Sequence, residues 1–135
     1  MEEHLNVANQ ERALILVVER DPHIKALERY FLEKAGFRVE FVDDGERGLE
    51  LSRAMHPHIV ISEILLPRRD GLSVCRTLKT DPATSDIAVL LFSILSAADR
   101  ARDAGADAFL RKPLDDRVLI HTVEQLLARP EEQRG

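Results

Sequence analysis

The sequence contains a single cysteine, no tryptophan and no long uninterrupted apolar run. One cysteine, Cys75, excludes an internal disulfide and is typical of a protein kept in a reducing compartment. No apolar stretch is long enough to span a bilayer, and the polar N-terminal residues MEEHLNVANQER contain no signal-peptide core. The formal net charge of −5 argues against a nucleic-acid-binding surface, which needs a concentrated basic face. We therefore expect a cytoplasmic protein that binds neither membranes nor nucleic acid.

What the sequence does have is the length and composition of one globular domain. The chain has 135 residues, of which 44% are hydrophobic and 32% are charged, and this is enough for a single core. Both ends are rich in charge and lack an apolar period, so we expect flexible segments at residues 1–11 and 129–135. The domain itself is then expected to span residues 12–128.

Between these ends, short apolar runs alternate with amphipathic segments. Leu14–Val18 is apolar throughout, which is typical of a strand buried on both faces. In the segment DPHIKALERYFLEKAG that follows, Asp21 can cap a helix with Pro22 at its first position, and Gly36 ends it. The strands expected from the pattern are Leu14–Val18, Phe37–Val42, Ile59–Ile64, Ile87–Phe92 and Ala108–Leu110. The further helices expected are Gly45–Met55, Leu72–Thr80, Ala97–Ala104 and Asp115–Ala128.

Five β–α repeats at this spacing predict a parallel sheet with helices on both faces. In such sheets, ligands bind outside the carboxyl ends of the strands. The residues directly after the strands are therefore the candidates for a site: Glu19, Arg20, Asp21, Glu63, Ser93 and Lys112. Acidic side chains gathered at strand ends often hold a divalent cation. An arginine in the middle of the group is therefore unexpected.

Several segments together resemble one known family. The segments "ILVVERD", "PHIVISEILLPRRDGLSVCRTLK", "IAVLLFS" and "AGADAFLRKPL" are similar to the receiver domain of bacterial two-component response regulators, over roughly residues 12–128. LPxxDG, a strand-end hydroxyl, AGAD and KP occur in this order, which makes the resemblance specific. It implies an α/β, flavodoxin-like (βα)5 fold, a doubly wound parallel sheet with strand order 2-1-3-4-5.

In the receiver family, an aspartate after the third strand accepts a phosphoryl group. That aspartate and acids after the first strand hold Mg²⁺, while a hydroxyl and a lysine bind the phosphoryl oxygens. The resemblance implies that Ser93 and Lys112 fill the two phosphoryl-binding positions. It also implies that Phe109 fills the switch aromatic position and Glu19 the first position of the acidic pocket. Asp21 belongs to the same acidic pocket and is also the expected helix cap.

Two positions depart from the family pattern. Glu63 stands where the acceptor aspartate is expected, and Arg20 stands where a second acid would bind the metal. Glu63 carries its carboxylate one methylene further out, and Arg20 replaces an oxygen ligand by a permanent positive charge. We therefore expect Arg20 to replace the metal by pairing with Glu63, while Lys112 holds Glu63 from the other side. We expect no cofactor, with Mg²⁺ binding lost or weak. Alternatively, Arg20 points into solvent and leaves Glu19 and Asp21 to bind metal weakly.

Two further segments bear on the site. Arg68 and Arg69 lie in the sequence PRRDG next to the crevice, where they would attract an anion unless the loop is simply solvated. Ser93 and Gly105 are 12 positions apart, which is about one helical turn less than in many receivers. The helix within segment 94–104 is therefore expected to be short or reorganised.

These departures favour a pseudo-receiver that is not an enzyme. We expect a stand-alone, phosphorylation-independent signalling or scaffolding module of a bacterial regulatory pathway, because only residues 129–135 follow the domain. It is expected to bind protein partners through the Ala97–Ala128 face, as a monomer or weak homodimer. One alternative is a phosphorylatable single-domain response regulator that accepts phosphate on Glu63 or the neighbouring Ser62. Another is a sensor of a small anion or a nucleotide, although no Gly-rich phosphate loop follows the first strand.

Overall fold

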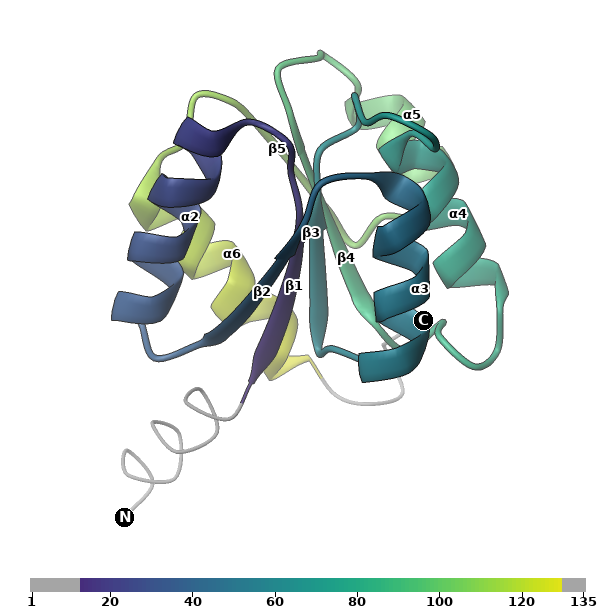
Figure 1. Ribbon diagram of the computed structural model, residues 1–135, viewed down its shortest axis with the longest axis horizontal. Coiled ribbons are helices and arrows are strands. Elements are labelled where there is room, and N and C mark those ends of the chain that lie inside the picture. Colours follow the sequence, from purple (N-terminus) through teal and green to yellow (C-terminus); the bar gives the residue numbers. More distant parts are fainter. Residues whose placement is uncertain (1–12, 130–135) are drawn as a thin grey trace.

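The computed structural model describes residues 13–129, which form one parallel sheet of five strands in the order β2-β1-β3-β4-β5 (Figure 1). The strands are β1 (Leu14–Val18), β2 (Arg38–Val42), β3 (Ile59–Ser62), β4 (Ala88–Ser93) and β5 (Ala108–Arg111). The helices are α2 (Pro22–Lys34), α3 (Gly45–Met55), α4 (Gly71–Thr80), α5 (Ala98–Asp103) and α6 (Asp116–Ala128). The predicted fold class and strand order are confirmed.

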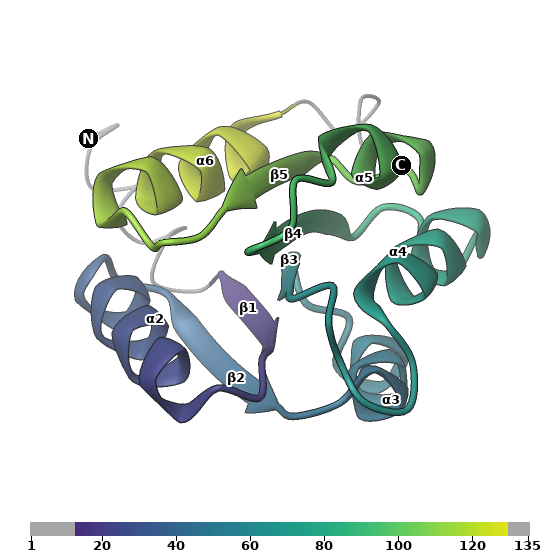
Figure 2. The ribbon, with the colours of Figure 1, turned by 90° about the horizontal axis from the view of Figure 1, so that it is seen from above.

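The helices cover both faces of the sheet, so the core has two layers. Helices α2 and α6 lie on one face, and α3, α4 and α5 lie on the other (Figures 1 and 2). Side chains alternate between the two faces along each strand. In β1, for example, Ile15 and Val17 contribute to the core under α2 and α6, while Leu16 and Val18 contribute to the core under α3, α4 and α5. Burial on both faces explains why β1 is apolar throughout.

Aspartates define where most of the helices begin. The side chains of Asp21, Asp44, Asp70 and Asp115 each accept backbone N–H bonds at the start of α2, α3, α4 and α6. These bonds satisfy amides that have no partner within the helix itself. The expected cap at Asp21, with Pro22 at the first helical position, is confirmed. As a result, four loops at the carboxyl edge of the sheet have fixed ends.

Several elements differ from the expected bounds by one residue at an end, such as β4, which is Ala88–Ser93 and was expected at Ile87–Phe92. Two further elements bear on the site. Strand β3 ends at Ser62, two residues before the expected Ile64. The amides of Ile64 and Leu65 bond to the side chain of Glu63, so they are not available for a longer ladder. Helix α5 has 6 residues, which confirms the expected short helix in segment 94–104.

The ends of the chain were expected to be flexible. Residues 1–12 and 130–135 lie outside the described residues, so this expectation is not tested there. Arg129, the first residue of the expected tail, is described, and its guanidinium forms an ion pair of 3.0 Å with Asp107. Within residues 13–129, no helix is long and apolar enough to cross a membrane.

Candidate functional site

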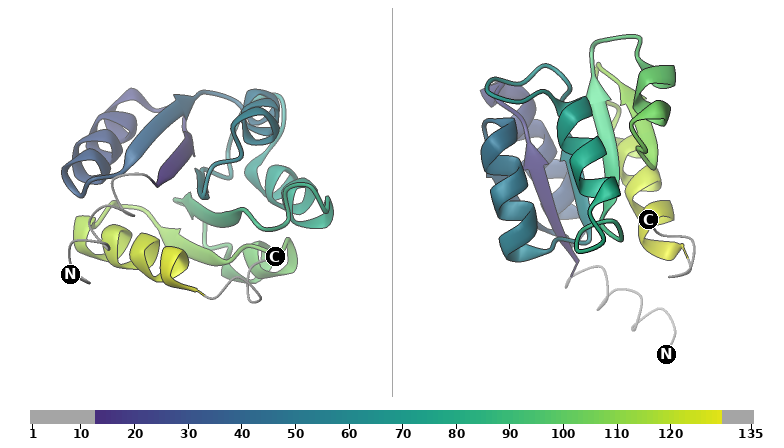
Figure 3. Two further views of the ribbon diagram at one scale, coloured as in Figure 1. Left: turned by 90° about the horizontal axis from the view of Figure 1, so that it is seen from below. Right: turned by 90° about the vertical axis from the view of Figure 1, so that its right-hand side faces the viewer.

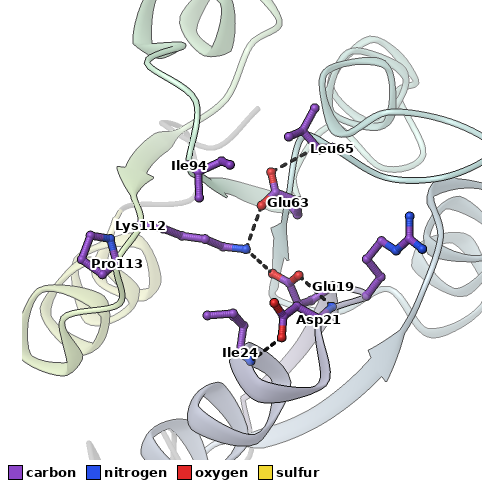
Figure 4. Close-up of a pocket in the computed structure, with 9 residues that line it drawn as sticks. Glu19, Asp21, Ile24, Glu63, Leu65, Ile94, Lys112 and Pro113 are labelled. Carbon is purple, nitrogen blue, oxygen red and sulfur yellow. Dashed lines mark hydrogen bonds and ion pairs between the residues drawn. The ribbon is translucent and has the colours of Figure 1, made fainter.

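The expected site residues converge at the carboxyl edge of the sheet. A hollow of about 520 Å³ opens there between the loops that follow β1, β3, β4 and β5 (Figure 4; the edge is at the top of the right-hand view in Figure 3). Charged residues and a rim of apolar side chains share its lining, which consists of Glu19, Arg20, Asp21, Ile24, Glu63, Leu65, Ile94, Lys112 and Pro113. The site is therefore formed by four loops that are distant in sequence.

Lys112 lies at the centre of this group (Figure 4). Its Nζ is 2.9 Å from Oε1 of Glu19 and 2.8 Å from Oε2 of Glu63. All three side chains are almost fully buried, with 9% of the Lys112 side chain exposed. A buried ammonium between two buried carboxylates leaves one net negative charge. Of the two cations that were expected to hold Glu63, Lys112, which follows β5, thus forms the ion pair.

Glu63 accepts hydrogen bonds at both carboxylate oxygens. Its Oε1 accepts from the Ser93 hydroxyl, from the Ile64 amide at 2.7 Å and from the Leu65 amide at 3.0 Å. Burial alone would raise the pKa of Glu63, but the bonds from Lys112, Ser93 and the Leu65 amide together hold this pKa below its ordinary value. Glu63 is therefore an ionised, fully bonded carboxylate.

The pKa of Lys112 is also shifted in the direction that keeps the group charged. Burial favours the neutral amine, but the bonds to Glu63 and Glu19 outweigh burial and raise the pKa of Lys112. Glu19 is held on its other oxygen as well, since its Oε2 accepts from the Asp21 amide at 3.1 Å. The three charges of Glu19, Glu63 and Lys112 consequently form a closed network, defined here as the ion cluster.

The loop that carries Glu63 is fixed by a close backbone approach. Gly71 donates its amide to the Ile64 carbonyl at 2.8 Å. A Cβ at Gly71 would lie 2.1 Å from the Glu63 carbonyl oxygen, so no side chain fits at this position. This contact gives a physical reason for the glycine of LPxxDG, because it brings the start of α4 against the loop after β3.

The expected contact between Arg20 and Glu63 is wrong. Arg20 is exposed at the rim of the hollow, and within residues 13–129 it forms no ion pair. The alternative expectation, an arginine that points into solvent, describes its environment. The physical reason is that Lys112 approaches Glu63 on the buried side of the site, where its ammonium binds the carboxylates of Glu19 and Glu63 at the same time. Arg20 would have to displace one of these bonds.

The remaining expected residues occupy simpler environments. Asp21 is exposed, and hydrogen bonds from the Ile24 and His23 amides lower its pKa. These contacts are those of a helix cap. Phe109 is partly buried and packs against the core beneath α5. In the basic loop, Arg69 bonds to Glu46 and to Ser73, and Arg68 is exposed with a φ of 71°. Only Arg68 of this pair is thus left as an exposed cation.

One charged residue near the site was not predicted from the sequence. Glu28 of α2 is 1% exposed, and its Oε1 has no hydrogen-bond partner among the described residues. A signal was present, because Ile24, Glu28 and Leu32 follow each other at intervals of four, which puts Glu28 on the core-facing side of the helix.

The described residues do not fit a resident Mg²⁺ ion. The carboxylates that follow β1 and β3 are bridged by the Lys112 ammonium, and no group of three metal-ligating side chains occurs within residues 13–129. A divalent ion would have to displace this ammonium and overcome the nearby charge of Arg20. That Mg²⁺ binding is lost or weak remains a prediction.

Comparison with protein families gives a match across most of the chain. A family model described as "Response regulator receiver domain" matches residues 15–124. Among curated proteins, the chain is 36% identical to the DNA-binding dual master transcriptional regulator RpaA of Synechocystis sp., over 118 residues that make up 85% of this chain and 49% of that protein. The transcriptional regulatory protein CseB of Streptomyces coelicolor is 35% identical over 120 residues, 85% of this chain and 49% of that protein. The chain thus spans about half the length of the curated relatives it matches.

Solved structures show the same similarity. The signal receiver domain of a signal transduction histidine kinase from Syntrophus aciditrophicus is 35% identical with a TM-score of 0.82, covering 87% of this chain and 91% of that one. The chemotaxis response regulator CheY4 of Vibrio cholerae has a TM-score of 0.79 at 21% identity, covering 85% of this chain and 98% of that one, and this likeness concerns the fold alone.

Proposed function

Because the chain belongs to the response regulator receiver domain family, we propose that it is a pseudo-receiver, which signals through protein contacts without a phosphorylation cycle. Receiver domains are the signalling modules of two-component systems, so a role in signal transduction follows from the family. The absence of a phosphorylation cycle is the proposal, and the ion cluster is the observation that supports it.

The supporting observation is the set of groups that hold Glu63. Ser93 and Lys112 occupy the positions that bind phosphoryl oxygens in the family, and here both bind the Glu63 carboxylate. Glu63 carries one negative charge, compared with about two for a phosphate. The Glu63 carboxylate therefore acts as a permanent, weaker substitute for the phosphoryl group. The ammonium and the hydroxyl remain engaged whether or not a phosphodonor is present.

The same contacts make Glu63 a poor nucleophile. In-line attack on a phosphodonor needs a free carboxylate oxygen in a defined position, and both oxygens of Glu63 already accept hydrogen bonds. The Ser62 hydroxyl is a poor alternative acceptor, because Ser62 is 0% exposed and its hydroxyl donates to the Glu63 carbonyl. These contacts weigh against a phosphorylatable response regulator on either residue.

The contacts also weigh against an anion or nucleotide sensor. Lys112 is bound by Glu19 and Glu63, and Arg69 is bound by Glu46, so two of the expected cations are already neutralised. We propose instead that the output is contact with a protein partner on the Ala97–Ala128 face. The expectations of a non-enzymatic, stand-alone protein without nucleic-acid binding remain proposals as well, since two curated relatives are described as transcriptional regulators.

Incubation of the full chain with acetyl phosphate and Mg²⁺, followed by intact-mass measurement, tests this function. We expect no gain of about 80 Da, the mass of one phosphoryl group. We also expect beryllofluoride with Mg²⁺ to leave the ¹⁵N–¹H spectrum unchanged. A phosphorylated species, or shifts confined to residues around Glu63 and Ser93, would contradict the proposal. The variant with Arg20→Asp and Glu63→Asp is the matched control, because it restores the two family residues.

A further inference from the structure

Glu28 is a buried carboxyl that the ion cluster does not use. It lies on α2 between Ile24 and Leu32 of the stripe that covers the sheet, where apolar side chains are the rule. Its Oε1 has no hydrogen-bond partner among the described residues, and only 1% of the residue is exposed. A buried carboxyl oxygen without a hydrogen-bond partner costs free energy in either protonation state of the group, and far more when the group is ionised.

The alternation of the strands places Glu28 on the same side of the sheet as the ion cluster. Ile15 and Val17 of β1 face α2 and α6, and Glu19 is the next residue in that alternation. Likewise Ile59 and Ile61 of β3 precede Glu63. The backbone ladder continues to these two glutamates, since the Glu19 amide donates to Val42 and the Glu63 amide donates to Val18, both at 3.0 Å. Both carboxylates therefore lie on the side covered by α2.

Lys112 retains one N–H that could bind a third carboxylate. Its ammonium has three donors, of which two are directed at Glu19 and Glu63. The ring of Phe92, whose centroid is 5.4 Å from Nζ, also borders the ammonium. Phe92 belongs to the core under α2 and α6, so this side of the ammonium faces the layer that contains Glu28.

Electrostatics tie Glu28 to the same three charges. Burial, with smaller contributions from the charges of Glu19 and Glu63, raises the pKa of Glu28 to about 8, although the charge of Lys112 acts to lower it. The charged groups that shift the pKa of Glu28 are Glu19, Lys112 and Glu63. The buried residues that β2 and α6 contribute to the core under α2 and α6 are apolar: Val39, Leu119, Val123 and Leu126. His121 of α6 is exposed. The charges that act on Glu28 are thus those of the ion cluster.

We propose that Glu28 is a buried proton-binding site that regulates the ion cluster. Protonated Glu28 leaves Lys112 on Glu19 and Glu63. When the carboxyl releases its proton to solvent, the new carboxylate repels Glu19 and Glu63 and competes for the free N–H of Lys112, which weakens the bond between Lys112 and Glu63. In a receiver without a phosphorylation cycle, proton release would then be an input to the site. This last step rests on the proposed function, whereas the proton binding does not.

A titration of the full chain by ¹⁵N–¹H NMR from pH 7 to 9.5 tests the proposal. The reporters are the amides of Ile64 and Leu65, because both donate to the Glu63 carboxylate. We expect their chemical shifts to change with one common midpoint near pH 8, and the ¹³C carboxyl signal of Glu28 to share it. Burial raises the pKa of Cys75 to about 12, and the pKa of Lys112 lies above its ordinary value, so neither group titrates in this window.

Variants assign the transition to Glu28. Glu28→Gln keeps the shape and removes the ionisation, so the common midpoint should disappear. Glu33→Gln, on the exposed side of the same helix, should keep it. Glu28→Leu gives a second variant in case the glutamine disturbs the fold. A Glu28 carboxyl that titrates in its ordinary range, or an unchanged transition in Glu28→Gln, would overturn the proposal. Neither result bears on phosphorylation, which the mass measurement tests separately.

Discussion

At the scale of single residues, Lys112 determines the charge balance of the site. It reaches two buried carboxylates at 2.9 and 2.8 Å, and it has the position that a metal ion would need if it were to bridge them. Removal of one partner from a buried ion pair is costly because the other charge stays buried without compensation. The stability of this site should therefore depend more on Lys112 than on any exposed pair.

We predict that Lys112→Met lowers the free energy of unfolding by about 3–5 kcal/mol at pH 7, because Glu19 and Glu63 then remain as buried charges of the same sign. Urea unfolding monitored by circular dichroism measures the effect. The matched control is Lys25→Met, which breaks the exposed pair with Asp43 and should cost at most about 1 kcal/mol. Equal losses in the two variants would show that the ion cluster is not a special source of stability.

The loss of unfolding free energy in Lys112→Met should depend on pH, and its direction follows from the pKa of Glu63. Because the pKa of Glu63 is lowered in the folded state, its contribution is present above the ordinary value of 4.5 and is lost as pH falls through the folded value. Lys112→Met removes that contribution. The difference in unfolding free energy between the wild type and the variant should therefore be full at pH 7 and should shrink below about pH 4. Urea unfolding of the wild type and of Lys112→Met, at pH 7 and below about pH 4, measures this difference.

The ionisation of Glu28 should change the free energy of unfolding with pH in the opposite direction to that of Glu63. Its folded pKa of about 8 is above the model-compound value of 4.5, so the folded state keeps a proton that the unfolded state releases. Its contribution to stability is complete below pH 4.5 and is lost as pH rises through 8, with a limiting slope of about 1.4 kcal/mol per pH unit. We predict that Glu28→Leu is more stable than the wild type, by an amount that grows from pH 5 to pH 8.

Thermal unfolding at several pH values measures this difference. Glu33→Leu is the matched control on the same helix, and because its side chain is half exposed it should leave the slope unchanged. A constant difference between Glu28→Leu and the wild type over this range would mean that Glu28 has an ordinary pKa.

At the scale of secondary-structure elements, a second ion cluster joins three elements at the opposite edge of the sheet. Asp107 at the start of β5 pairs with Lys79 of α4 and with Arg129 at the end of α6, both at 3.0 Å. It also accepts the Val89 amide of β4 at 2.8 Å. Because the Lys79 and Asp107 side chains are only 9% and 10% exposed, this cluster fixes α4 and the end of α6 against the sheet.

We predict that Asp107→Ala destabilises the chain by about 3–5 kcal/mol, because it leaves the Lys79 ammonium buried with the Ile87 carbonyl as its one remaining partner within residues 13–129. Hydrogen exchange should show lost protection in the last turns of α4 and α6 and little change around Glu63. Asp99→Ala, which breaks an exposed pair with Arg102, is the matched control and should have almost no effect. Lost protection confined to the Glu63 loop would contradict this assignment.

The elements themselves were largely predictable from the sequence, because periodicity and capping are local properties. Leu14–Val18 and Gly45–Met55 have the bounds that were expected from the pattern. The end of β3 was not predictable, since it depends on the Glu63 side chain taking the Ile64 and Leu65 amides. The pair between Lys112 and Glu63 was expected from the strand-end residues. The failure of Arg20 to join it was not, because a pattern of strand-end residues does not contain the distances between side chains.

At the scale of the whole molecule, the fold brings five charges to one edge, and their sum decides what binds there. The carboxylates of Glu19, Asp21 and Glu63 face the cations of Arg20 and Lys112, which leaves one net negative charge. A hard divalent ion needs several oxygen ligands and a strongly negative site. Arg20 contributes to this balance through its permanent charge at the rim, although it does not contact Glu63.

We predict that Arg20→Asp combined with Glu63→Asp binds Mg²⁺, because four carboxylates then face Lys112 alone and the net charge becomes three negative. Glu63→Asp by itself should not bind, since it leaves the charge unchanged and keeps Arg20 at the rim. Isothermal titration with Mg²⁺ measures binding in both variants. If Glu63→Asp alone binds Mg²⁺ as tightly as the double variant, the charge of Arg20 is not what keeps the metal out of this receiver.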